Sequence, residues 1–272
     1  MSHLTRISRR VLSSTASIDG PTFVIFGAAT GNIGGCLAQR LLANHPGSAV
    51  HIVGRSEEKL SALEAHLASL TGAPDRIHMA VMDAVNDPKA VDEFFSKRLD
   101  GAPTGVANCI GSVILKPAHS TTDAEWRSTL DTNATSAFNI LRAASKKMMR
   151  GEGGSIALCA SAVALHGVQN HEAIAAAKGA VAAMTKSAAS TYAPKNIRVN
   201  AVAPGLIATP MTSKITSNEA ARKASEAMHA LKRIGTPEDV ASALEFFLHP
   251  SNSFVTGQIL GICGGLSSAR AQ

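Results

Sequence analysis

Short apolar runs alternate with longer amphipathic stretches along the chain from Pro21 onward. The apolar runs are typical of strands buried on both faces of a sheet, and the amphipathic stretches are typical of helices. Strands are predicted at Thr22–Phe26, Ala49–Val53, Arg76–Val81, Gly105–Asn108, Ser155–Cys159, Ile197–Ala201 and Gln258–Gly261. Helices are predicted at Ile33–Ala43, Ser56–Ser69, Pro88–Arg98, Asp123–Met149, His171–Tyr192 and Pro237–Leu248. This alternation predicts an α/β fold: a single Rossmann-type, doubly wound parallel sheet of about seven strands flanked by helices.

Two predicted helices begin with capping signals, and one long segment lacks strand character. Ser56 precedes two glutamates, and Thr236 precedes a proline and two acids.

In Pro204–Gly235 we expect small helices or a lid, over a ligand site at the carboxyl ends of the strands. We assign residues 21–268 to one domain, because a chain of 272 residues suits one large α/β domain with a short extension.

Composition and charge limit the classes of partner. Hydrophobic residues make up 45% of the chain, charged residues 17% and aromatic residues 4%, with a net charge of +6. Because the basic residues are dispersed and aromatic rings are few, we expect no nucleic-acid platform. No apolar run approaches the length of a membrane span. The four cysteines are far apart and form no Cys-x-x-Cys pair, which is typical of reduced thiols in an intracellular protein.

Residues 1–20 form a predicted N-terminal extension. Three arginines face a single acid, Asp19, among many Ser and Thr residues. This composition fits an organellar transit peptide, and a disordered tail fits equally well. We therefore expect the protein in the cytoplasm, or in a mitochondrial or plastid matrix if the extension is a transit peptide.

A glycine-rich turn follows the first predicted strand. The run Gly27-Ala-Ala-Thr30-Gly31-Asn32-Ile33-Gly34 leads directly into a predicted helix. Glycines in this context let the backbone turn sharply and approach a pyrophosphate, with the helix N-terminus facing the phosphates. The strand before it and the helix after it make the pattern a specific prediction of a dinucleotide site.

The end of the second predicted strand indicates which dinucleotide binds. A site selecting NAD(H) usually offers an acid to the adenosine ribose, and none stands in Val53-Gly54-Arg55, where the second predicted strand ends. Arg55 suits a 2′-phosphate, although a solvated arginine at the start of the next helix is the alternative interpretation. The sequence favours NADP(H), with NAD(H) as the alternative.

A serine and a lysine follow the fifth predicted strand. Ser161 comes directly after that strand, and the next helix contains Ile174-Ala-Ala-Ala-Lys178. This layout resembles the active site of the short-chain dehydrogenase/reductase family, whose helix carries Tyr-x-x-x-Lys. In that family the tyrosine stands thirteen residues after the serine and four before the lysine, and both spacings here point to Ile174. Isoleucine cannot donate a proton, and the chain's one tyrosine, Tyr192, lies outside the motif.

Other segments extend the resemblance over roughly residues 21–265. They are Asn108-Cys-Ile-Gly111, Pro204-Gly-Leu-Ile-Ala-Thr209, Arg233–Val240 and Val255-Thr-Gly-Gln258. Among the branches of the family, the chain is most similar to the 3-oxoacyl-acyl-carrier-protein reductases.

The resemblance implies roles on the cofactor side for four residues. It implies that Asp83 contacts the adenine and that Asn108 supports the sheet near the nicotinamide. It also implies that Thr209 and the backbone before it, including Ile207, hold the carboxamide.

The resemblance implies further roles in the chemistry. Ser161 would bind the carbonyl oxygen, and Asn133 would help to hold a proton-relay water. Lys178 would hold the ribose hydroxyls and, where a tyrosine is present, would lower the pKa of that tyrosine.

A histidine is the candidate replacement for the missing proton donor. His171 lies three residues before Ile174 and seven before Lys178, offsets that place the three on one helical face. Some divergent enoyl reductases of the family carry their tyrosine in Tyr-x6-Lys, and imidazole titrates near neutrality. The alternative is that His171 only begins the helix, and His166 is a second candidate. The pair His171-Glu172 lacks the later histidine of a zinc-protease motif, because Ala175 stands there, so we expect no metal site.

Two functions follow from these observations. One is an NADP(H)-dependent oxidoreductase that transfers hydride on a small-molecule carbonyl or acyl substrate, with His171 or water as the proton source. The other is a pseudoenzyme that binds the cofactor and serves as a structural or partner subunit. The resemblance also implies a homo-oligomer, a dimer or a tetramer.

Overall fold

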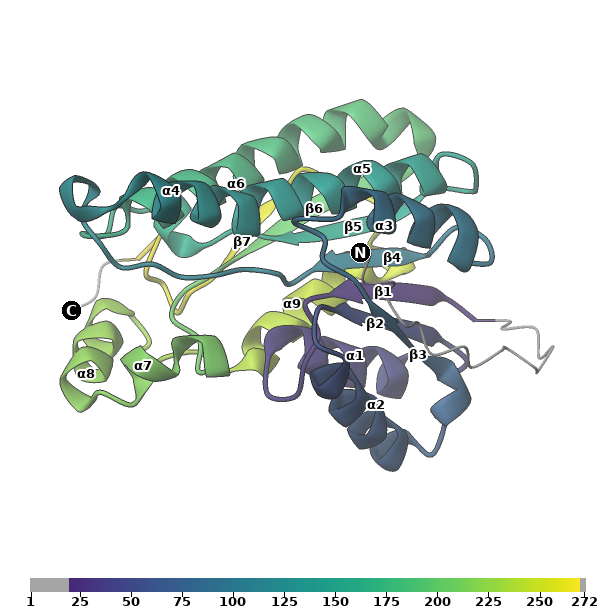
Figure 1. Cartoon of the computed structure of the whole chain (residues 1–272), viewed down its shortest axis with the longest axis horizontal. Coiled ribbons are helices and arrows are strands. Elements are labelled where there is room, and N and C mark those ends of the chain that lie inside the picture. Colours follow the sequence, from purple (N-terminus) through teal and green to yellow (C-terminus); the bar gives the residue numbers. More distant parts are fainter. Residues whose placement is uncertain (1–19, 270–272) are drawn as a thin grey trace, which may run out of the picture.

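The computed structural model describes residues 20–269. Within this range seven parallel strands form one sheet in the order β3-β2-β1-β4-β5-β6-β7 (Figure 1). The strands are β1 (Thr22–Phe26), β2 (Ala49–Gly54), β3 (Ile77–Val81), β4 (Gly105–Asn108), β5 (Gly154–Cys159), β6 (Ile197–Pro204) and β7 (Ile259–Ile262). The strand order reverses between β1 and β4, which makes the sheet doubly wound and confirms the predicted fold class. The extension predicted at residues 1–20 lies, apart from Gly20, outside the described residues.

Helices cover both faces of the sheet, as Figure 1 shows. One core packs α1, α2 and α9 against the sheet, and the other packs α3, α5 and α6. Strand β1 serves both cores, because Phe23 and Ile25 point to the first and Val24 and Phe26 to the second. The helices are α1 (Ile33–Asn44), α2 (Glu57–Thr71), α3 (Pro88–Glu93), α4 (Asp123–Leu130), α5 (Ser136–Met148), α6 (Glu172–Tyr192), α7 (Ser213–Thr216), α8 (Glu219–Met228) and α9 (Pro237–Leu248).

The helix predicted at Asp123–Met149 contains an irregular turn. A π-helical turn, Asp131–Thr135, separates α4 from α5 and contains the buried Asn133. Another π turn, Phe94–Arg98, follows α3. The apolar periodicity does not reveal such turns, because each spans only five residues. The predicted strand at Arg76 is also one residue too long, because Pro74–Arg76 form a 3₁₀ turn.

The segment between β6 and α9 consists of short helices, as predicted. A 3₁₀ turn, α7 and α8 follow β6, and a bridge between Ile207 and Gly235 returns the chain to α9. In Figure 1, α7 and α8 stand away from the sheet at the end toward which α4 extends. No helix in residues 20–269 is long and apolar enough to cross a membrane.

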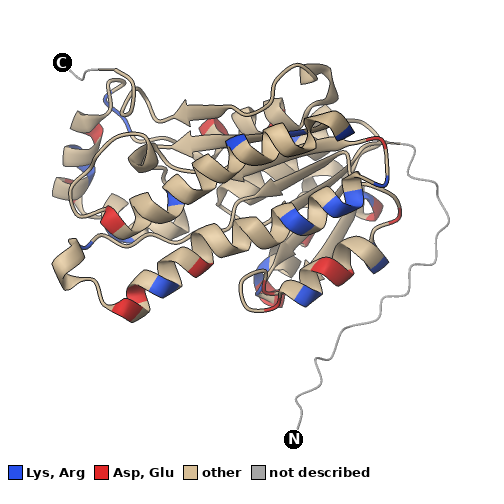
Figure 2. Ribbon diagram, turned by 90° about the horizontal axis from the view of Figure 1, so that it is seen from above, with Lys and Arg blue, Asp and Glu red and all other residues tan. Residues whose placement is uncertain are grey.

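Charged side chains lie mainly on the outer surfaces of the helices. Figure 2 shows Lys and Arg interspersed with Asp and Glu along them. Several pairs of opposite sign are four residues apart on one helix, such as Lys223 with Glu219 at 2.7 Å. Such pairs belong to a solvated surface.

Candidate active site

A cavity of about 960 Å³ lies at the carboxyl ends of the strands. Its walls come from the turn after β1, the segments after β4, β5 and β6, and helices α6 and α8. Because β1 and β4 flank the point where the strand order reverses, the cavity stands where a doubly wound sheet binds its ligand.

The glycine turn after β1 holds its shape through Asn32. Gly27 and Gly31 have φ angles of 80° and 74°, which residues with a Cβ rarely adopt. The Asn32 side chain accepts hydrogen bonds from Ala29 N at 3.1 Å and Gly35 N at 2.9 Å, and it donates to Gly27 O at 2.9 Å. One amide thus caps α1 and braces the turn before it.

Close packing of this turn depends on Gly34 and also on Gly35, which the motif prediction omitted. A Cβ at Gly34 would lie 2.9 Å from Gly27 O, and a Cβ at Gly35 would lie 2.2 Å from Ala29 O. The doublet of glycines at the helix start was the signal in the sequence for this second position.

The turn fits the diphosphate of a dinucleotide. Among the described residues, no hydrogen bond uses the N–H groups of Ile33 and Gly34, and no acid lies in the first turn of α1. Ile33, Asn32 and Thr30 all line the cavity. Free N–H groups at a helix N-terminus favour a bound phosphate through hydrogen bonds and the helix dipole.

Arg55 and Asp83 pair with each other at the ends of β2 and β3. Arg55 Nη1 lies 3.8 Å from Asp83 Oδ2, and the arginine side chain is 70% exposed. Asp83 also accepts hydrogen bonds from Val85 N and from Asn86, and these bonds together with Arg55 lower the pKa of its carboxyl although burial opposes them. Neither residue lines the cavity, whereas Lys59 of α2 does. The sequence analysis did not single out Lys59, which lies in the first turn of α2.

Thr212 holds the loop after β6. Its hydroxyl accepts a hydrogen bond from Thr209 N at 3.1 Å and donates to Ile207 O. Ile207 and Thr209 line the cavity, as expected for residues near a bound ring. Asn108 does not line the cavity, and its side chain accepts from Ile110 N at 2.9 Å. Asn108 therefore shapes the turn after β4.

Lys178 is buried at the centre of the cavity wall. Its ammonium donates to Cys159 O at 2.7 Å, and burial lowers the pKa of the lysine while the nearby Cys159 and Cys109 thiols oppose that shift. A hydrogen bond with Cys109, together with the charge of Lys178, lowers the pKa of the Cys159 thiol against the effect of its burial. An ammonium has three protons to donate, so two remain for a ligand.

Ser161 and Ile174 line the same cavity as Lys178. The Ser161 hydroxyl makes one long hydrogen bond to Pro204 O, at 3.4 Å, and accepts another from Val163 N, also at 3.4 Å. Ile174 is 4% exposed, so an apolar side chain occupies the position that the family motif gives to a phenol.

Asn133 reaches the cavity through Ser112. Its side chain accepts from Ser112 N at 3.1 Å and donates to Ser112 Oγ at 3.0 Å and Thr129 O at 2.9 Å. A Cβ built on Gly111 would lie 3.2 Å from Asn133 Oδ1 and 3.4 Å from Lys178 Nζ, so the glycine leaves the space between them open. Asn133 itself does not line the cavity, whereas Ser112, which the motif analysis did not single out, does.

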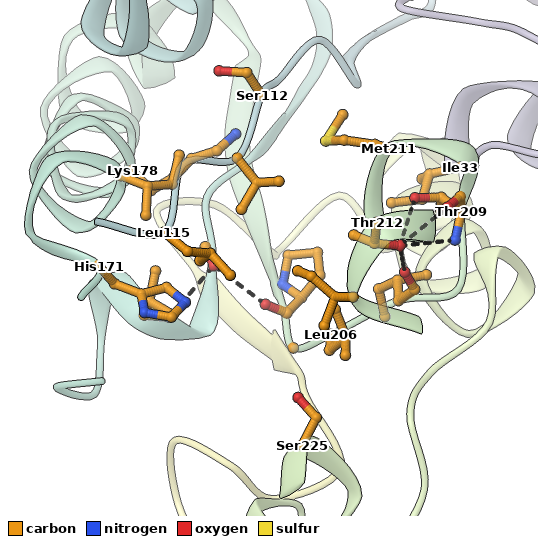
Figure 3. A pocket seen from close by; sticks show the side chains of 18 of the residues that line it. Ile33, Ser112, Leu115, His171, Lys178, Leu206, Thr209, Met211, Thr212 and Ser225 are labelled. Atoms are coloured by element: carbon orange, nitrogen blue, oxygen red, sulfur yellow. Dashed lines mark hydrogen bonds between the residues drawn. The ribbon is translucent and has the colours of Figure 1, made fainter. Parts of the chain in front are cut away.

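His171 stands at the N-cap of α6, just before its first turn. Its Nδ1 lies 2.7 Å from Gln169 O, and Asn170 between them has a φ of 62° that folds the loop back. A carbonyl only accepts, so Nδ1 carries the proton and Nε2 is left for another partner. Figure 3 shows His171 and Lys178 on one side of the pocket, with Thr209 and Thr212 on the other. The second candidate, His166, is exposed and outside the lining.

His229, which sequence reasoning also missed, fixes the end of α8. It is 2% exposed, its Nδ1 lies 2.6 Å from Ser225 O, and its Nε2 accepts a hydrogen bond from Leu206 N at 3.4 Å. The residues from 20 to 269 contain no cluster of three His, Cys, Asp or Glu that could hold a metal ion.

Comparison with known proteins places this site in a family. A family profile described as Enoyl-(Acyl carrier protein) reductase matches residues 27–267. The chain is 34% identical to a 3-oxoacyl-(acyl-carrier-protein) reductase of Thermotoga maritima, with 92% of this chain and 98% of that protein covered. It is 30% identical to a chloroplastic tropinone reductase homolog of Arabidopsis thaliana, with 92% and 77% covered.

Solved structures agree with these matches. A short-chain type dehydrogenase/reductase from Mycobacterium ulcerans superposes with a TM-score of 0.83 at 31% identity, covering 92% of this chain and 91% of that one. ElxO with NADP bound superposes with a TM-score of 0.84 at 28% identity, covering 92% of this chain and all (100%) of that one.

Proposed function

The chain belongs to the short-chain dehydrogenase/reductase family, and on that premise we propose that it is an NADP(H)-dependent oxidoreductase acting on a carbonyl or hydroxyl group of a small-molecule substrate. One observation carries the proposal: a hydroxyl, an ammonium and an imidazole line the same cavity as the glycine turn. These groups are Ser161, Lys178 and His171. Hydride transfer needs a cofactor and a polarised carbonyl in one enclosed space.

The residues of the cofactor end favour NADP(H). The free N–H groups of Ile33 and Gly34 suit the diphosphate, and the two spare protons of Lys178 suit ribose hydroxyls. Arg55 and Lys59 supply two cations near the adenosine end, where NAD(H) sites usually place an acid. ElxO, which was solved with NADP bound, supports this choice. When bound, the nicotinamide ring would supply or accept the hydride.

Ser161 is the group that binds and polarises the substrate oxygen in this proposal. Its present bonds are long, 3.4 Å each, so the hydroxyl can turn to a substrate oxygen at little cost. Because hydride transfer to a carbonyl leaves an oxyanion, a donor at this position lowers the barrier.

His171 replaces the phenol as proton donor. With Nδ1 held by Gln169 O, the protonated ring presents Nε2–H to the cavity and returns to the neutral tautomer after donation. A positioned general acid contributes about 10²–10⁴-fold in rate.

Titration of the purified protein with NADPH and with NADH tests the cofactor site, and a ketone and alcohol screen follows. We expect tighter binding of NADPH, and turnover that falls about 100-fold in His171→Ala. His166→Ala is the matched control, because His166 is exposed outside the cavity. Cofactor binding without turnover of any substrate would contradict the enzymatic proposal.

A second candidate function, a cofactor-binding pseudoenzyme, is favoured by the buried Ile174. The apolar side chain of Ile174 stands where the family has the tyrosine that donates a proton. Ile174→Tyr separates the two candidates. A large gain in turnover would show that the rest of the site is competent but lacks its acid, whereas a loss would show that another group, such as His171, already acts.

A homo-oligomer, dimer or tetramer, completes the proposal. Exposed aromatic residues stand on α4 and α5, namely Trp126 and Phe138, on α9, namely Phe246, and in the segment between α9 and β7, namely Phe254. Large exposed apolar side chains in groups mark protein interfaces. Light scattering on the eluting protein measures the mass, and a monomer at micromolar concentration would contradict the expectation.

A further inference from the structure

The cavity has two ends of different chemistry. The glycine turn, Thr30 and Lys59 line the cofactor end. Beyond Ser161, the other end is lined by apolar side chains from the segments after β4, β6 and β7 and from α7 and α8, including Val113, Leu115, Leu206, Ile215, Met228 and Leu266. Among the described residues that line the whole cavity, there is no Asp, Glu or Arg, and the only lysines are Lys59 and Lys178.

Helix α8 turns its apolar side toward this second end. Ala221, Ala224 and Met228 line the cavity, yet none of the residues of α8 is buried in the protein. The charged residues of the same helix pair with one another, for example Arg222 with Glu226 at 2.9 Å. Met228 is 45% exposed. An amphipathic helix with its apolar side open to a cavity gains stability when an apolar ligand covers that side.

Apart from Lys59, Lys178 and the histidines, the polar side chains beyond the glycine turn that line the cavity are neutral, among them Ser112, Gln169, Asn170 and Ser225. The ring of His229 lies in the wall, but both of its nitrogens are engaged, with Ser225 O and Leu206 N. Its ring is therefore occupied in holding α8 against the loop after β6. Ile174, which lines the same cavity as Ser161, has no hydroxyl, whereas the family motif has a tyrosine at this position. Lys178 and His171 line the same cavity, but the proposed function assigns the first to the cofactor and the second to proton donation. No other side chain of the second end could pair with a buried carboxylate or phosphate, and an unpaired buried charge is costly.

We propose that this site takes an uncharged, largely apolar ketone or secondary alcohol whose reacting oxygen is its main polar contact, and that it rejects carboxylates and phosphates. The inference rests on the proposed function, because it assigns Ser161 to the reacting oxygen. The apolar body of the substrate would lie between the loop after β4 and α8, where Leu115 and Met228 are.

A matched pair of ligands tests the inference on the full chain loaded with saturating NADP⁺. The pair is 5-oxodecanoic acid and its methyl ester, which differ in charge and have nearly the same apolar body. Calorimetry should show the ester binding at least about 30-fold more tightly than the carboxylate. Equal or tighter binding of the carboxylate would overturn the inference, and so would the absence of ester binding to protein that binds NADP⁺.

Two variants locate the effect. Met228→Lys places a cation at the apolar end and should narrow the preference for the ester by at least about tenfold. Met149→Lys adds the same charge at an exposed position after α5, outside the cavity, and should leave the preference unchanged. An equal change in both variants would contradict the placement. NADP⁺ binding is measured first, so the two possible failures are distinguishable. If the protein does not bind NADP⁺, the proposed function is wrong. If it binds NADP⁺ but does not prefer the ester, only the substrate assignment is wrong.

Discussion

The two ends of the cavity are built by different means. The cofactor end is a backbone structure, in which Asn32 makes three hydrogen bonds within one turn and a Cβ on Gly35 would lie 2.2 Å from a carbonyl oxygen. The substrate end consists of side chains from separate loops and helices, and its serine makes only bonds of 3.4 Å. Backbone geometry tolerates few residue types, whereas a side-chain wall accepts many. The contrast explains how Ile174 can replace a family tyrosine while the glycine turn remains.

The largest effect is expected from Lys178, which lies between the two ends. Lys178→Met keeps the length of the side chain but removes the ammonium that donates to Cys159 O and, by proposal, to the ribose. Hydrogen bonds to a charged group contribute about 1.5–3 kcal/mol each, so losing two to the ribose should weaken NADPH binding about 100-fold or more. Fluorescence titration measures it.

The matched control is Lys186→Met, an exposed position on the same helix. It should bind NADPH as the unmodified protein does. An unchanged affinity in Lys178→Met would show that the ammonium serves only the protein and does not hold the cofactor.

A smaller loss is expected from Gly35→Ala at the cofactor end. The new Cβ would overlap Ala29 O, so the turn and the start of α1 must separate, at about 2–3 kcal/mol of unfolding free energy. Urea unfolding measures this loss, and NADPH affinity should fall with it.

Gly179→Ala makes the same change on α6, at a position outside the cavity lining. No atom lies within 4 Å of a Cβ at Gly179, which is inside α6. Alanine there should raise the stability by about 0.5–1 kcal/mol. Equal effects at Gly35 and Gly179 would show that close backbone packing does not set the stability of the glycine turn.

This contrast also explains which features the sequence could predict. The fold and the glycine turn follow from local patterns, because apolar runs, caps and glycines act over a few residues. The partners of His229 and the exposure of Lys59 depend on segments that are distant in sequence. The π turn that contains Asn133 spans only five residues, too few for the apolar periodicity to separate it from regular helix. Spacing predicted Ile174 and Lys178 on one helix, whereas the hydrogen bond from Lys178 to Cys159 O joins α6 to β5 and depends on the fold.

The next effect is a pH dependence of the sheet under the cofactor end. Burial, and then the neighbouring His78, lower the pKa of His51 to about 3. Because this pKa is below the unfolded value near 6.5, the neutral ring is favoured by folding. Stability is therefore complete above pH 6.5 and falls as the pH drops toward 3, by about 1.4 kcal/mol per unit.

His51→Val should flatten this slope between pH 6.5 and 5. Urea unfolding at the two pH values gives the difference, and His119→Ala, at an exposed position, should keep the original slope. A slope unchanged by His51→Val would assign the acid sensitivity to other groups, such as His78, whose ring centroid lies 4.7 Å from that of His51.

The smallest effect concerns the ion pair that joins the segment after α8 to α9. Arg233 donates to both oxygens of Asp239, at 2.7 and 3.0 Å, and these bonds, followed by one from Thr236 N, lower the pKa of Asp239 to about 2. A carboxyl whose pKa falls below its usual 3.8 stabilises the fold above pH 4, and that contribution is lost as the pH drops through 2.

Asp239→Asn should cost only about 1 kcal/mol at pH 7, because the carboxylate is 32% exposed and solvent screens the pair. The variant should also lose less stability than the unmodified protein between pH 4 and pH 2. Glu219→Gln is the control, since its pair with Lys223 is 81% exposed at the glutamate and should contribute almost nothing. If Asp239→Asn instead weakened ester binding while the free energy of unfolding stayed constant, the pair would position the lid above the substrate end. Helix α9, which carries Asp239, would then be part of the substrate end of the cavity.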